Sequence, residues 1–167
     1  MLRWYGKSMA TLLLVAPHAV VAAPAAPAVY TPAPGTAERT AIMKTLHAGD
    51  DSPQSRFIIR RLRVLHAGTR AIAYVQATGP IGDFQAILQR AGRSPWRKVW
   101  GEGDGGSNDC RAGAAHYAWA VRLLKTYPVG PDAIVPGIVA RTAELQRMAK
   151  TDPDAQCVGD LDGGTVD

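Results

Sequence analysis

The fold is decided by the stretch RFIIRRLRVLHAGTRAIAYVQAT, residues 56–78. Its two halves, 56–66 and 69–78, are rich in β-branched residues and are separated only by Ala67 and Gly68. In the second half small apolar residues alternate with larger or polar ones, which is typical of a β-strand with two different faces. A two-residue break is too short for a crossover between parallel strands, so the stretch predicts an antiparallel hairpin.

Two more strand-like runs follow, 83–90 (DFQAILQR) and 96–100 (WRKVW), each after a short break that contains glycine and proline. Phe84, Ala86 and Leu88 would share one face of their strand. Because every break is short, the four runs predict a four-stranded antiparallel meander.

A short amphipathic helix should precede the meander, over residues 36–47. Thr36 is a suitable N-cap, and Ile42, Met43 and Leu46 recur at helical spacing. The alanines on one face of the run 69–78 would let this helix approach the sheet closely. Residues 36–101 therefore predict an α+β unit in which a helix packs on the meander.

The chain after residue 101 predicts a helical hairpin. One helix should begin at Asn108 or Asp109 and run to about Tyr127, and a second should run from Asp132 to about Lys150. Pro136 is tolerated only if it falls in the first turn of the second helix. The hairpin, 102–157, completes a single domain over 36–157, and residues 158–167 are expected to form a flexible tail.

The N-terminal segment has the pattern of an export signal. Arg3 and Lys7 precede an apolar run, 9–21, that ends in small residues, so residues 1–23 are expected to be a cleaved signal peptide. The run is shorter than the roughly 20 residues that cross a bilayer. Residues 24–35, rich in proline and alanine, should form a disordered leader. The mature chain should then lack a membrane span and be periplasmic or secreted.

Both cysteines, Cys110 and Cys157, lie in the mature part of the chain. An even number of cysteines in an oxidising compartment indicates a disulfide. We therefore expect a Cys110–Cys157 bridge that closes the helical hairpin.

Several short motifs accompany this order of elements. They are R-x-x-I-x-x-x-L from Arg39 to Leu46, L-x-V-x-x-A-G over 62–68, A-Y-V over 73–75, and the runs FQAILQR and PWRKVW. Together with the order of a helix and a meander, they resemble uncharacterised secreted bacterial proteins with a cystatin-like or NTF2-like α+β sheet. The resemblance covers residues 36–101 and implies a fold, because its motifs occupy core and turn positions. It carries over no functional residues.

Charge is distributed unevenly along the chain, whose formal net charge is +5. Residues 56–100 contain one acid, Asp83, against nine basic residues: Arg56, Arg60, Arg61, Arg63, Arg70, Arg90, Arg93, Arg97 and Lys98. Residues 101–167 contain ten acids and six bases. The sequence is therefore a basic middle followed by an acidic end.

Arginines beside aromatic residues on an open sheet could form a binding surface. The candidate residues are Arg61, Arg63, Tyr74, Trp96 and Trp100. Such a surface would take an acidic protein or an anionic envelope polymer. In the alternative interpretation, the acidic helical tail covers this face and the charges pair within the molecule.

The polar stretch GEGDGGSNDC, 101–110, does not match a calcium loop. Counting from Asp104, the third position is Gly106 and the twelfth is Ala115, where oxygen ligands are needed. The histidines are scattered, without the paired spacing of a zinc site. We expect no metal and no cofactor, and the sequence has no specific nucleic-acid signature and leaves the oligomeric state open.

No nucleophile-elbow motif G-x-S-x-G occurs in the chain. The sequence therefore favours an exported, non-catalytic binding protein of the bacterial envelope, with an inhibitor-like or immunity-like role as one version. The alternative is a small NTF2-like enzyme, in which Asp83 or Asp109 would act with His116 and Tyr74 around a cavity in the sheet.

Overall fold

The computed structural model describes residues 1, 27–50, 52 and 56–164, and the predicted signal peptide lies, apart from Met1, outside the described residues. The described chain is α+β. None of its described helices is long and apolar enough to cross a membrane. The elements are α1 (Ala37–His47), β1 (Ile58–Ala67), β2 (Arg70–Gly79), β3 (Gly82–Ala91), β4 (Arg97–Asp109), α2 (Cys110–Leu124), α3 (Pro131–Ile134), α4 (Ile138–Thr151) and β5 (Gln156–Gly163).

The sheet is antiparallel and has five strands in the order β1-β2-β3-β4-β5, which corrects the prediction of four. Strand β4 continues through the glycine-rich stretch to Asp109, well beyond the predicted end at Trp100. Strand β5 pairs with it, Asp162 opposite Gly101 and Asp160 opposite Gly103. Residues 158–163, expected in a flexible tail, therefore belong to the sheet.

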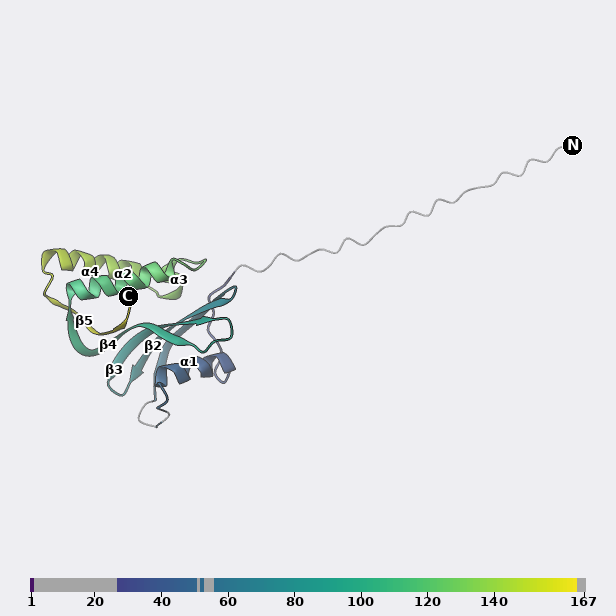
Figure 1. Ribbon diagram of the computed structural model, residues 1–167, viewed down its shortest axis with the longest axis horizontal. Helices are drawn as coiled ribbons and strands as arrows, with labels where there is room; N and C mark the ends of the chain where they lie inside the picture. Colours follow the sequence, from purple (N-terminus) through teal and green to yellow (C-terminus); the bar gives the residue numbers. More distant parts are fainter. Residues whose placement is uncertain (2–26, 51, 53–55, 165–167) are drawn as a thin grey trace.

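Both faces of the sheet are covered, so the molecule has three layers. Helix α1 lies on one face, and α2, α3 and α4 lie on the other (Figure 1). Alternate residues of β2 enter different cores, since Ala73 and Val75 join the core beneath α1 while Ile72 and Tyr74 join the opposite core. The alanines of β2 pack against the α1 layer, as predicted.

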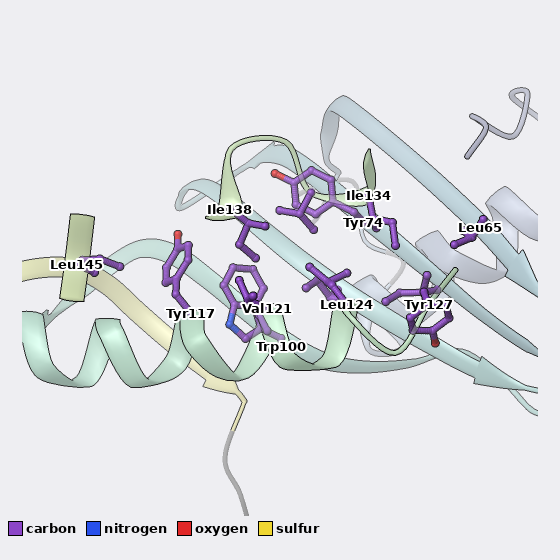
Figure 2. Close-up of a cluster of buried hydrophobic side chains, with 14 of the residues drawn as sticks. Leu65, Tyr74, Trp100, Tyr117, Val121, Leu124, Tyr127, Ile134, Ile138 and Leu145 are labelled. Atoms are coloured by element: carbon purple, nitrogen blue, oxygen red, sulfur yellow. The ribbon is translucent and has the colours of Figure 1, made fainter. Parts of the chain in front are cut away.

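The larger core lies between the sheet and the C-terminal helices. Trp100 of β4 is completely buried there and packs with Tyr117, Val121 and Leu124 of α2 (Figure 2). The buried tryptophan side chain removes a large apolar area from water, which stabilises the fold. The acidic tail is thus a structural layer of the domain.

Two of the three predicted helix starts are confirmed by their caps, and the third is corrected, because α3 begins at Pro131 with Gly130 at its N-cap. The Thr36 side chain accepts a hydrogen bond from the Arg39 N–H at 3.4 Å, and Asp109 accepts one from the Ala112 N–H at 2.7 Å. The predicted helix 132–150 is interrupted between α3 and α4. Pro136 lies in the break, and Gly137 adopts a positive φ of 81° before α4 begins. Proline has no N–H to continue the helix, which explains the interruption.

The predicted disulfide is confirmed, since Cys110 at the start of α2 is bonded to Cys157 in β5. Next to the bond, the Cys110 N–H donates to the Ala155 carbonyl at 2.8 Å. The bridge therefore holds the fifth strand to the first turn of the helical layer.

The described part of the proline-rich leader lies along the edge strand β1. Tyr30 and Val64 exchange two backbone hydrogen bonds, of 2.9 Å and 2.7 Å. The Thr31 hydroxyl donates to the Leu62 carbonyl at 2.7 Å. The expectation of a fully disordered leader is therefore corrected at these residues, because unpaired groups of an edge strand offer partners to the backbone.

Candidate functional site

The structure does not bring the five predicted binding residues together on one surface. Trp96 is buried beneath α1, while Tyr74 and Trp100 are buried on the opposite face. Arg61 is exposed, and the half-buried Arg63 donates to the Ala133 carbonyl at 2.7 Å. The aromatic residues serve the two cores, because both faces of the sheet carry a layer of helix.

The helical cover expected in the alternative interpretation is present, but its acids rarely pair with the basic strands. Among the described ion pairs, Lys98 with Asp162 is the one that joins the basic middle to the acidic end. Arg63 and Arg70 instead donate to backbone carbonyls of the cover. A carbonyl accepts from a guanidinium N–H but does not neutralise the positive charge, which remains available to an anion.

Three arginines line a hollow of about 280 Å³, hereafter the basic hollow, where β2 begins, β3 ends and β4 begins. The strand register assembles it, since Arg70 is opposite Ala91 and Gln89 is opposite Arg97. The side of the hollow toward the helical cover is closed by Tyr127, just after α2. Its lining residues are Arg70, Gln89, Arg90, Ala91, Ser94, Pro95, Arg97 and Tyr127.

Arg70 is fixed by the segment that follows α2. Its guanidinium donates to the Thr126 carbonyl at 2.9 Å and lies 4.9 Å from the centre of the Tyr127 ring. The Tyr127 hydroxyl in turn accepts a hydrogen bond of 2.9 Å from Gln89. These contacts orient Arg70 and reduce the entropy that it would lose on binding a ligand.

Arg90 and Arg97 are held differently. The guanidinium carbon of Arg90 lies 4.8 Å from the centre of the Trp96 ring, and its Nη2 is 3.4 Å from a Glu38 carboxylate oxygen. The Nε of Arg90 is buried without a hydrogen-bond partner. Arg97 is exposed, and within the described chain its side chain has no hydrogen bond and no ion pair. Arg97 thus leaves the basic hollow with cationic donors that no described residue uses.

The described residues that line the basic hollow carry positive charge and no negative charge. None of the described residues that line it carries a carboxylate. Glu38, which lies outside the lining, also contacts His66 at 2.8 Å and accepts from the Tyr30 hydroxyl. Burial, with the Glu38 contact, raises the pKa of Tyr30 to about 12, so this phenol remains a donor. Guanidinium groups arranged in this way match the geometry of phosphate and carboxylate oxyanions.

A separate polar network lies at the margin of the larger core. Gln85 accepts from the Tyr74 hydroxyl at 3.0 Å, and its amide contacts Glu102 at 3.0 Å and the Tyr117 hydroxyl at 2.8 Å. The Tyr117 hydroxyl also donates to Glu102. Burial raises the pKa of both tyrosines, and the Glu102 carboxylate raises that of Tyr117 further. Both phenols therefore remain protonated donors at neutral pH.

The network borders a hollow of about 250 Å³ that is lined in part by Gln85, Tyr117 and Arg141. The network differs from the predicted set of acid and base residues, and Tyr74 is the one residue that belongs to both. Asp109 caps α2, and the buried His116 contacts the Gly101 carbonyl at 2.9 Å. Asp83 accepts from the Thr78 hydroxyl at 2.5 Å. Gln85 and Glu102 had no sequence signal, because strand register alone makes them neighbours.

Among the described residues, no group of three or more histidine, cysteine, aspartate or glutamate side chains is placed to hold a metal ion. The chain matches no family model, and no curated protein and no solved structure is significantly similar to it. Assignment of a function therefore rests on the geometry of the sites themselves.

Proposed function

We propose that this protein is an exported, non-catalytic binding protein of the bacterial envelope, and that the basic hollow receives an anionic group of its partner. The observation that carries the proposal is that Arg70, Arg90 and Arg97 line one hollow that has no carboxylate among its described lining residues. An N-terminal segment with the pattern of a signal peptide, and a disulfide between Cys110 and Cys157, support a periplasmic or secreted location.

The partner is an acidic protein or an anionic envelope polymer. Both present oxyanions, carboxylate in one case and phosphate in the other, which guanidinium groups bind through paired hydrogen bonds. An inhibitor-like or immunity-like role is one form of such binding. We also propose that residues 36–101 adopt a cystatin-like or NTF2-like arrangement of helix and sheet.

The test is isothermal titration of the purified mature protein with two polyanions, polyphosphate and poly-glutamate. The variant is Arg70→Ala/Arg97→Ala, and the matched control is Arg61→Ala, which removes an exposed arginine outside the hollow. We expect the double variant to bind at least about tenfold more weakly, since charged hydrogen bonds of this kind each contribute about 1.5–3 kcal/mol. The control should bind like the wild type.

The two titrants distinguish the two kinds of partner. Preference for polyphosphate favours the envelope polymer, and preference for poly-glutamate favours the acidic protein. Binding should weaken as salt is raised, because exposed charges are screened. Equal loss of binding in the control and in the double variant would show that the hollow has no special role.

The small enzyme remains a second candidate because of one observation, the network of Tyr74, Gln85, Glu102 and Tyr117 beside a hollow. The variants Tyr117→Phe and Glu102→Gln show whether the network has a structural role or forms an active site. If the network is structural, each variant lowers the free energy of unfolding by about 1–2 kcal/mol. If it is an active site, removal of such a group leaves stability unchanged or raised.

A further inference from the structure

A third hollow, of about 300 Å³ and hereafter the acidic hollow, lies on the α1 face of the sheet, at the end opposite the basic hollow. It is open because β4 places Gly101 and Gly103 on this face, opposite Ala86 and Phe84 of β3. Neither glycine places a side chain on the sheet surface there. Helix α1 ends beside it, where Leu46 contributes to the wall.

The walls of the acidic hollow are apolar. Phe57 and Phe84 pack edge to face, with ring centres 4.9 Å apart, and both line it. Ile81 stands at its margin in the β2–β3 turn and is 93% exposed. An exposed aliphatic side chain beside an apolar hollow is typical of a surface that buries its apolar area against a partner.

The rim carries the opposite charge to the basic hollow. Strand β5 directs Asp160 and Asp162 to the same face, because residues two apart on a strand share a face. Asp162 pairs with Lys98. The Asp160 side chain has neither a hydrogen bond nor an ion pair among the described residues. The charged residues that line the hollow are Asp83, Asp104, Asp160, Asp162, Lys98 and Glu102. The Glu102 carboxylate is hydrogen-bonded to Gln85 and Tyr117 in the polar network.

We infer that the acidic hollow docks a segment of a partner protein in which lysine or arginine flanks one apolar side chain. The apolar residue would enter over Gly101 and Gly103, and the flanking cations would meet Asp160 and the aspartates beside it. Charge complementarity selects a basic segment, and the apolar walls select a residue of the size of leucine. This site is independent of the basic hollow, with which it shares no lining residue.

Three short peptides test the inference by NMR titration of the ¹⁵N-labelled mature protein: acetyl-GKLKG-amide, acetyl-GKSKG-amide and acetyl-GELEG-amide. The first should shift the amide signals of Gly103, Asp160 and Asp162. The second lacks the apolar residue and the third reverses the charge, so both should shift these signals much less. A peptide this short binds in the millimolar range, which NMR titration measures.

Two variants separate the apolar contribution from the charged one. Gly103→Val fills the hollow, and its Cβ meets nothing closer than 3.9 Å, so the chain should fold normally. It should weaken binding of the first peptide about tenfold or more. Asp160→Asn/Asp162→Asn should weaken it about fivefold, as expected for two exposed ion pairs. The exposed Asp154 supplies the control, and Asp154→Asn should leave affinity unchanged.

Three results would overturn the inference. One is equal binding of the acidic and basic peptides, and another is unchanged affinity in Gly103→Val. The third is a shift of the same signals with protein concentration alone, which would assign the acidic hollow to a second copy of this chain.

Discussion

Arg90 lies over the ring of Trp96, with 4.8 Å between the guanidinium carbon and the ring centre. The Nε of the arginine and the Nε1 of the tryptophan are both buried without a hydrogen-bond partner. Arg90 also contacts Glu38 in the first turn of α1. One side chain therefore links the α1 layer, a buried aromatic ring and the basic hollow.

Replacement of Arg90 by alanine should lower the free energy of unfolding by about 1–2 kcal/mol, because it removes the ring contact and the ion pair with Glu38. Urea denaturation followed by tryptophan fluorescence measures this change. Arg93→Ala, at an exposed residue in the β3–β4 turn, is the control and should stay within about 0.5 kcal/mol of the wild type. Equal effects of the two changes would refute the linking role of Arg90.

Two glycines on neighbouring strands should respond very differently to alanine. A Cβ at Gly159 would lie 1.8 Å from the Gly103 carbonyl oxygen, a backbone atom that cannot move aside cheaply. A Cβ at Gly103 meets nothing closer than 3.9 Å. We expect Gly159→Ala to cost more than about 3 kcal/mol and Gly103→Ala less than about 1 kcal/mol in the same denaturation experiment. Similar values would contradict the close pairing of β4 and β5.

Strands β1, β2 and β3 were predictable to within a few residues, because their alternating apolar residues face two different cores. Strand β5 was not, since its sequence, QCVGDLDG, is rich in glycine and aspartate, which are depleted in strands. It pairs with β4 and is tied to α2 by the disulfide. The strand propensity of these residues did not predict this tertiary arrangement.

The positive charge of the basic hollow could be predicted from the sequence, but the residues that line it could not. The excess of arginine in residues 56–100 was the signal. Which arginines meet depends on strand register and on the position of Tyr127 after α2, and neither follows from the sequence pattern. Trp100 seemed a binding residue for the same reason, because the sequence does not show that helices cover both faces of the sheet.

Stability should fall as pH is lowered below neutrality because of His116. Burial lowers its pKa below the ordinary value of 6.5, so the unfolded chain binds this proton more readily than the folded protein. The folded protein has its full stability with respect to this group above pH 6.5, where His116 is neutral in both states. This stability is lost as pH falls from there toward the pKa of His116 in the folded protein. Thermal unfolding between about pH 7.5 and about pH 5.5 should show a falling Tm. In His116→Gln this slope should be smaller, and an identical slope would exclude His116 as its source.

Loss of the disulfide should be costly because it closes a long loop. Cys110 and Cys157 are 47 residues apart. Cys110→Ala/Cys157→Ala should lower the free energy of unfolding by about 4 kcal/mol in the chain-entropy model. Urea denaturation measures the loss, and a reducing agent should reproduce it in the wild type but have no effect on the double variant. A loss below about 1 kcal/mol would contradict a stabilising role for the bridge.

We expect Arg70, Arg90 and Arg97 to receive an oxyanion together. The most direct measurement is an NMR titration that follows the arginine Nε–H signals of the mature protein as polyphosphate is added. The signals of these three arginines should shift together and saturate, while that of Arg61 should move little. Uniform small shifts of all arginines, or a larger shift at Arg61 than at Arg90, would contradict this expectation.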